Sequence, residues 1–381
     1  MINFEKPGAR AFLRAAIVSL LLAANYDVAF AETQRFWSFG DSFTDISNDQ
    51  PWHPDNPSQF KSEAEHGKHY YPVSYQLFNA LGLSTGSSIF LSFGQSGSTV
   101  LETPWRGWLN NQVGAALKNL GEAKLGSNDV VMINMGINDA DVATGKSKTV
   151  TQGAKFAKEA AENAAKQMQR LVDKGARNFI FMAFNSVGFV PEWQAWNSPE
   201  KFARADKFAK TYFDTLRQTL APLTQDGARI LLIDLDKVYG SVRNNLRGDD
   251  TVKFDCFGPI GKDESCRGRT SIAVLVDALH PTTSGFKILA KQVARAYQDP
   301  GTVPDFATLI IDSGGLHGSI INDGTIVLYT GKDSRFAATI SGPGALTFAG
   351  PGRLLLEGRV ELTPLTPVEK DPRLSELLHL Q

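Results

Sequence analysis

The segment Arg35-Phe36-Trp37-Ser38-Phe39-Gly40-Asp41-Ser42 decides the fold that this sequence predicts. Its first part, Arg35–Phe39, is short and rich in aromatic residues, which is typical of a strand buried on both faces of a parallel sheet. Gly40 permits a tight turn, and the polar residues Asp41 and Ser42 follow at once. In open parallel sheets, ligands bind beyond the carboxyl ends of the strands. We therefore expect Asp41 and Ser42 to lie at the carboxyl ends of the strands, where a ligand would bind.

Further strands and helices alternate along the chain up to about residue 299. Three apolar runs are predicted as strands, and three stretches with a period of three to four residues are predicted as helices. The strands are Asp129–Met135, Asn178–Phe184 and Arg229–Leu235, and the helices are Thr151–Lys174, Glu200–Leu220 and Ser284–Tyr297. This alternation predicts an α/β fold with a parallel sheet between helices.

A second polar turn, Gly136-Ile137-Asn138-Asp139, follows the predicted strand at 129–135. Because the carboxyl ends of parallel strands share one edge, this turn and the Gly40–Ser42 turn should deliver polar groups to the same place. Asp41 and Asp139 are expected to tie these loops together rather than to perform chemistry.

A serine hydroxyl becomes a useful nucleophile only when an oriented base removes its proton. Of the six histidines, His280 alone lies in an Asp-x-x-His pattern, with Asp277 three residues earlier and Pro281 directly after. This spacing lets one loop present both side chains, although the pattern alone also fits a surface turn. No Gly-x-Ser-x-Gly motif occurs, which argues against an α/β-hydrolase of that type.

His66 and His69 form a His-x-x-His pattern in a polar stretch that also contains Glu63 and Glu65. A metal site is conceivable there, but a solvated loop is the commoner outcome for such a pattern. We therefore expect no metal and no cofactor.

Four short motifs together resemble those of the GDSL esterase/lipase family, also called SGNH hydrolases. Gly40-Asp41-Ser42-Phe43-Thr44-Asp45 is similar to the first block of the family and Phe93-Gly94-Gln95-Ser96-Gly97-Ser98-Thr99 to the second, while Gly136–Asp139 is similar to the third and Asp277–Pro281 to the fifth. The resemblance covers residues 35 to about 297. It implies a three-layer, flavodoxin-like α/β fold with a central parallel sheet.

The resemblance also implies a role for each matched residue. Ser42 would attack the ester carbonyl, His280 would take and return the proton, and Asp277 would orient His280. The oxyanion hole would comprise the backbone N–H of Ser42, the backbone N–H of Gly97 and the side-chain amide of Asn138. The second block departs most from the family pattern at Ser92 and Ser96, and a shifted alignment would make Gly94 the donor instead.

The first 31 residues have the pattern of a secretory signal peptide. Lys6, Arg10 and Arg14 precede an apolar run, Ala15–Ala24, and Ala29-Phe30-Ala31 offers small residues for cleavage. The run is too short to span a bilayer, so we expect export to the periplasm, cell surface or medium and no transmembrane helix in the mature chain. Cleavage would leave 36 basic and 38 acidic residues, a balance that does not suggest a nucleic-acid partner.

Cys256 and Cys266 lie ten residues apart. In an exported chain a local disulfide is expected, while a metal site or two free thiols are the alternatives.

The character of the sequence changes after Pro300. Residues 301–362 contain short apolar segments separated by glycine-rich turns, for example at 325–329, 345–348 and 353–356. They predict a small all-β segment, either a solenoid or one similar to autotransporter passenger repeats, followed by a polar tail at 363–381. We accordingly divide the chain into a signal peptide (1–31), a hydrolase domain (32–300), this segment and the tail.

The sequence therefore favours a secreted serine ester hydrolase of the carboxylesterase or lipase type that acts on a small-molecule or lipid ester. A carbohydrate deacetylase, a lipid acyltransferase, a surface adhesion module and peripheral contact with lipid surfaces stay open as alternatives. Tryptophans in predicted loops (Trp52, Trp105, Trp108, Trp193 and Trp196) either line an apolar acyl cleft or pack structurally.

Overall fold

A computed structural model of the chain describes residues 34–46, 72–103, 107–146, 149–188, 198–246, 281 and 283–362. The predicted signal peptide, the two cysteines and the polar tail lie outside these residues. The proposed boundaries at residues 31, 300 and 362 stay predictions.

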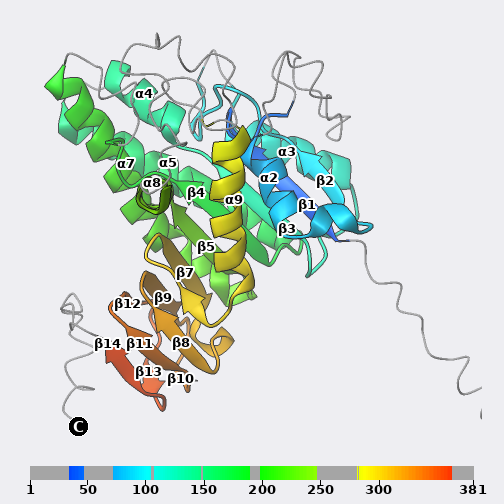
Figure 1. Cartoon of the computed structure of the whole chain (residues 1–381), viewed down its shortest axis with the longest axis vertical. Coiled ribbons are helices and arrows are strands. Elements are labelled where there is room, and N and C mark those ends of the chain that lie inside the picture. Colours follow the sequence, from blue (N-terminus) through cyan, green and yellow to red (C-terminus); the bar gives the residue numbers. More distant parts are fainter. Residues whose placement is uncertain are drawn as a thin grey trace, which may run out of the picture. The chain divides into compact units, whose positions relative to one another are not determined.

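The fold is built on an eight-stranded sheet (Figure 1). Its first five strands are β1 (Arg35–Gly40), β2 (Ile89–Ser92), β3 (Val130–Asn134), β4 (Asn178–Ala183) and β5 (Arg229–Asp234). They are parallel and lie in the order β2-β1-β3-β4-β5, which is the flavodoxin-like order. The predicted α/β fold is confirmed, and all four predicted strands match observed ones to within a residue at each end.

Helices cover the sheet in two groups. The described helices are α2 (Val73–Ala80), α3 (Leu109–Leu120), α4 (Ile137–Lys146), α5 (Val150–Asp173), α7 (Pro199–Thr219), α8 (Leu235–Leu246) and α9 (Thr283–Gln298). Helices α2 and α8 pack on α9, whereas α3, α4 and α7 pack on α5. In Figure 1, α2 and α9 lie in front of the sheet. The predicted helices at 151–174, 200–220 and 284–297 are confirmed.

Local sequence explains where the two longest helices begin. Thr149 caps α5 and forms a reciprocal capping box with Gln152, while Ser198 caps α7 ahead of Pro199. Such caps satisfy backbone N–H groups that have no partner within the helix.

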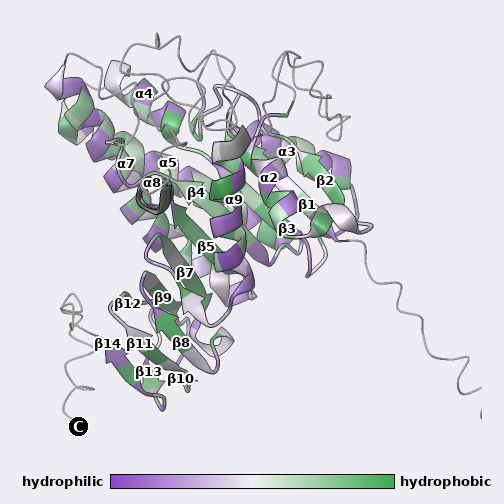
Figure 2. Ribbon diagram, in the orientation of Figure 1, coloured by the Kyte–Doolittle hydropathy of each residue, from purple (hydrophilic) through white to green (hydrophobic). Residues whose placement is uncertain are grey.

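The core lies where the strands meet the helices. Residues of β3, β4 and β5 are almost fully buried, and aromatic rings from β1 and the β2 loop stack, with the Phe39 and Phe93 centroids 5.4 Å apart. Figure 2 shows the hydrophobic residues concentrated on these strands, with hydrophilic residues on the outer sides of the helices.

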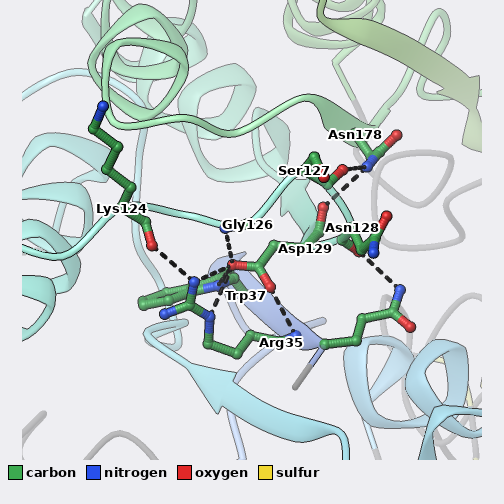
Figure 3. Close-up of polar contacts among 9 residues, drawn as sticks. Arg35, Trp37, Lys124, Gly126, Ser127, Asn128, Asp129 and Asn178 are labelled. Carbon is green, nitrogen blue, oxygen red and sulfur yellow. Dashed lines mark hydrogen bonds and ion pairs between the residues drawn. The ribbon is translucent and has the colours of Figure 1, made fainter. Parts of the chain in front are cut away.

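The buried carboxylate of Asp129 holds the N-terminal ends of the central strands together (Figure 3). It accepts hydrogen bonds from Arg35 N (2.9 Å), Arg35 Nε (2.8 Å), Trp37 Nε1 (3.3 Å) and Gly126 N (3.0 Å). It also lies 2.7 Å from Arg35 Nη2 in an ion pair. This cluster joins the starts of β1 and β3.

The C-terminal strands form a coil whose first face continues the central sheet. Strand β7 (Ala307–Asp312) pairs antiparallel with β5, and β9 (Thr325–Tyr329) and β12 (Ala345–Ala349) follow in parallel. The other strands are β6 (Thr302–Val303), β8 (Ser319–Asn322), β10 (Ser334–Phe336), β11 (Thr339–Gly342), β13 (Leu354–Leu356) and β14 (Val360–Leu362). Thr325 pairs with Ala345, Ser334 with Leu354 and Ile340 with Val360, so these later coils take 20 residues each. The first coil is shorter, since Thr308 pairs with Thr325. The predicted all-β segment is confirmed.

Candidate functional site

Ser42 lies in the turn that follows β1, at the carboxyl edge of the sheet and half-buried. Gly40 makes this turn possible, since its φ of 152° is one that side chains rarely adopt. A Cβ at residue 40 would stand 2.4 Å from the carbonyl oxygen of Asn134 and 2.6 Å from Thr44 Oγ1. Glycine is therefore required immediately before the Asp41-Ser42 pair.

Asp41 stabilises the turn from inside. Its buried carboxylate accepts hydrogen bonds from Phe43 N and from Asn134 Nδ2, each at 3.0 Å. Its carbonyl oxygen accepts from the backbone N–H groups of Thr44 and Asp45, also at 3.0 Å. As expected, Asp41 serves the geometry of the loop.

The loop after β2 is fastened against this turn. Gln95 N donates to the carbonyl oxygen of Gly40 (3.0 Å), and Ser96 N donates to Asp45 Oδ2 (2.7 Å). Gly94 packs tightly on Thr44, because a Cβ there would lie 2.3 Å from Thr44 Oγ1. Gly97 has a φ of 77°, and a Cβ there would meet no atom within 4 Å. In this loop there is thus free space next to the Cα of Gly97 but not next to that of Gly94.

The loop after β3 is joined to the β2 loop by two side chains at the start of α4. Asn138 Nδ2 donates to the carbonyl oxygen of Ser98 (3.0 Å). The carboxylate of Asp139 accepts from the backbone N–H of Val100 (2.9 Å) and of Leu101 (3.3 Å). As expected, Asp139 ties the two loops together, and Asn138 lies beside the loop that carries Gly97.

The predicted general base His280 and its orienting residue Asp277 lie outside the described residues, and so do Cys256, Cys266, His66 and His69. The nearest described part of that region is Pro281, which is buried, followed by α9. Phe286 in the first turn of α9 packs edge-on against Phe43, the residue after Ser42, with ring centroids 5.4 Å apart. The start of α9 therefore lies against the Ser42 turn.

Tyr212 of α7 lies beneath these loops. Burial raises the pKa of its hydroxyl well above the ordinary value, and the negative charges of Asp139 and Asp41 add to the effect. The phenol therefore stays neutral at physiological pH and is unsuited to act as a base.

Of the tryptophans that were predicted to line a cleft or to pack structurally, only Trp108 lies in the described residues. It lines a cleft of about 420 Å³ together with the polar side chains of α5, and Ser42 is not among the described residues of that cleft. Trp52, Trp105, Trp193 and Trp196 lie outside the described residues, so the apolar cleft stays a prediction for them.

Neither a metal site nor a membrane span is found in the part of the chain that the structure describes. Within it, no three histidine, cysteine, aspartate or glutamate side chains come together in a way that could hold a metal ion. None of its helices is long and apolar enough to cross a bilayer.

Three positioning residues were missed by the sequence analysis. Asn134 and Asp45 hold the Ser42 turn and the β2 loop, as described above, and Gln112 of α3 bonds to Gly40 and to Ser98. Asp45 could have been noticed, since it closes the first motif. Asn134 and Gln112 carried no signal, because their partners lie far away in the sequence.

The chain matches the GDSL-like lipase/acylhydrolase family over residues 37–293. No curated protein matches it. Among solved structures it is similar to a carbohydrate acetylesterase from Sinorhizobium meliloti, with 15% identity and a TM-score of 0.37 over 69% of this chain and 97% of the other.

Two further solved structures are similar to the chain. One is an extracellular lipase from Streptomyces rimosus, with 14% identity and a TM-score of 0.35 over 70% of this chain and 100% of the other. The second is an acetylxylan esterase from Geobacillus stearothermophilus, with 16% identity and a TM-score of 0.37 over 70% and 94%. At these identities and scores the likeness says nothing about the substrate.

Proposed function

Because the chain belongs to the GDSL-like lipase/acylhydrolase family, we propose that it is an exported serine hydrolase that cleaves carboxylic esters through an acyl-enzyme on Ser42. One observation carries this proposal. The loops after β1, β2 and β3 meet where the strand order reverses and are joined there by hydrogen bonds. In doubly wound sheets this reversal point is where ligands bind.

In the proposed reaction, Ser42 Oγ attacks the carbonyl carbon of the ester while its proton passes to the imidazole of His280. The tetrahedral intermediate then collapses, and the alcohol leaves with that proton. Water attacks the acyl-enzyme by the same route, which releases the acid and restores Ser42. Asp277 accepts a hydrogen bond from the imidazole and keeps it in the productive tautomer.

The position of α9 supports His280 as the base. His280 is three residues before Thr283, the first residue of α9, and three residues span at most about 10 Å of chain. Since Phe286 packs on Phe43, the described start of α9, from which His280 is separated by so short a length of chain, lies close to the turn that bears Ser42.

The oxyanion of the intermediate would be held by the N–H groups of Ser42 and Gly97 and by the side-chain amide of Asn138. There is free space next to the Cα of Gly97, and Asn138 is bonded to the carbonyl oxygen of the following residue, Ser98. Neutral donors that are already fixed in place stabilise developing negative charge without having to reorganise, and the loss of one typically costs about 10²–10³ in turnover.

The experiment compares Ser42→Ala with the wild type and with Ser87→Ala, which changes an exposed serine in the turn before β2. Hydrolysis of p-nitrophenyl acetate and decanoate and labelling by a fluorophosphonate are measured. We expect Ser42→Ala to lose about 10³-fold or more in kcat and all labelling, since the nucleophile is gone. Ser87→Ala should behave as the wild type. Full activity in Ser42→Ala, or none in the wild type, would contradict the proposal and favour an adhesive role.

The same assay addresses the substrate. Comparing acetylated sugars with glycerides and phospholipids separates a deacetylase from a lipase, because the triad is shared and only the recognised groups differ. Faster turnover of the longer p-nitrophenyl esters would support the apolar acyl cleft and lipid substrates.

A further inference from the structure

Gln112, on the first turns of α3, links the two loops that hold the proposed nucleophile and the proposed oxyanion donor. Its side chain is almost completely buried, with 2% of its surface exposed. Gly40 N donates to Gln112 Oε1 (2.8 Å), and Gln112 Nε2 donates to the carbonyl oxygen of Gly40 (2.8 Å) and to Ser98 Oγ (3.2 Å). One carboxamide thus bonds to Gly40, which is two positions before Ser42, and to Ser98, which directly follows Gly97.

The sheet explains why a side chain is needed there. Strand β2 pairs with β1 only as far as Ser38 and Ser92, and the chain then turns away into the 93–98 loop. Gln95 N still reaches the carbonyl oxygen of Gly40, but the N–H of Gly40 bonds to Gln112 instead of to a neighbouring strand. The carboxamide therefore replaces a strand residue at the end of β1. A buried N–H without any partner would be costly.

We propose that Gln112 is a positioning residue for ester hydrolysis: by holding Gly40 and Ser98 it sets the separation between Ser42 and the oxyanion donor Gly97. This inference rests on the proposed function of Ser42. Glutamine suits the role because it is neutral and has a donor and an acceptor at one end, which match the C=O and N–H of Gly40. Methionine has a similar size but neither group.

The test compares Gln112→Met with Gln167→Met in the full-length protein. Gln167 of α5 is a fitting control, because it is also buried (3% exposed) and also makes side-chain hydrogen bonds, to Asn163 and Arg170 of its own helix. For each variant, kcat and KM on p-nitrophenyl acetate and the rate of fluorophosphonate labelling at Ser42 are measured well below the melting temperature.

We expect Gln112→Met to lower kcat and the labelling rate by about 10–100-fold, with KM changed by less than about threefold, because misplacement affects the transition state more than ground-state binding. Gln167→Met should lose thermal stability but keep its labelling rate. A labelling rate of Gln112→Met close to that of the wild type would overturn this inference alone. A wild type that is not labelled at Ser42 would overturn the proposed function as well.

Ser98→Ala provides a second and milder variant in case Gln112→Met does not fold. It removes the hydroxyl that Gln112 contacts and leaves the backbone carbonyl that Asn138 uses. We expect labelling to slow by about threefold or more, and the double variant to be no slower than Gln112→Met, since the two changes remove a shared bond. Unchanged labelling in Ser98→Ala, or fully additive losses in the double variant, would contradict the link between the loops.

Discussion

At the scale of single residues, two carboxylates of this protein each bind an arginine but differ in burial. Asp129 has a side chain only 2% exposed and pairs with Arg35 at 2.7 Å. Glu357 is 40% exposed and pairs with Arg335, itself 74% exposed, at 2.6 Å. The distances are nearly equal, so the surroundings and not the geometry should decide what each pair contributes to stability.

We expect Asp129→Asn to lower the free energy of unfolding by about 3 kcal/mol, because it leaves a partly buried guanidinium and several N–H groups facing an amide. Glu357→Gln should change it by less than about 1 kcal/mol, since water screens the exposed pair. Urea denaturation of both variants measures the difference, and equal effects would argue against burial as the cause. Labelling of Ser42 in folded Asp129→Asn should be unaffected, because Asp129 lies at the N-terminal ends of the strands and Ser42 at their C-terminal ends.

At the scale of elements, the junction of β5 and α8 gathers negative charge. Asp234 ends β5 and Asp236 lies in the first turn of α8, while the charge of Asp206 in α7 acts on Asp236. Burial, together with the charges of Asp234 and Asp206, raises the pKa of the Asp236 carboxyl to about 6, although Lys237 opposes the shift. The folded protein therefore binds this proton more tightly than the unfolded chain does.

This raised pKa makes the stability of the folded protein depend on pH. A group whose pKa is higher in the folded state contributes fully to the stability of the folded protein when the pH is below the pKa of the unfolded chain. That contribution is lost as the pH rises through the pKa of the folded state, here between about pH 4 and 6. Asp236→Asn has no charge to bury, so it should gain stability over the wild type by about 1–2 kcal/mol as the pH rises from 4 to 7, discounted for partial exposure.

Chemical denaturation of Asp236→Asn and wild type at several pH values measures this gain. The same substitution at the exposed Asp305 is the control. A difference between Asp236→Asn and wild type that stays constant from pH 4 to 7 would show that the carboxyl titrates as in the unfolded chain.

At the scale of the whole molecule, the coiled C-terminal strands are joined to the hydrolase sheet. β7 bonds along the edge of β5, and Ile310 in β7 is fully buried. All six tryptophans precede residue 200, so tryptophan fluorescence reports on the hydrolase part only. If the two parts unfold together, a substitution in β7 should therefore shift the unfolding transition that the distant tryptophans report.

We expect Ile310→Ala to lower the melting temperature recorded by tryptophan fluorescence, because the cavity costs about 2–5 kcal/mol. Leu355→Ala, at a side chain that is 48% exposed, should leave the melting temperature nearly unchanged. If Ile310→Ala melted as the wild type by fluorescence while circular dichroism showed an earlier loss of strands, the two parts would unfold independently.

The hydrophobic pattern predicted most of the fold correctly. The strands that begin at Arg35, Asn178 and Arg229 and the helix at 151–174 were located to within a residue, because burial on a sheet or on one helical face leaves a local period in the sequence. Short strand β2 was not predicted. It spans four residues, Ile89–Ser92, of which one is exposed, two are partly buried and only Ser92 is buried, so it carries little periodic signal.

The sequence by itself determined the elements and which loops carry polar motifs: Ser42, Gly97 and Asn138 each follow a strand, and that much is local. Only the tertiary structure decided the partners: Gln112 bonding to Gly40 and Ser98, Asp139 holding Val100, and β7 extending the sheet from β5 in the opposite direction. The physical reason is that a period records whether a residue is buried, whereas a hydrogen bond between distant segments depends on where the folded chain places both groups.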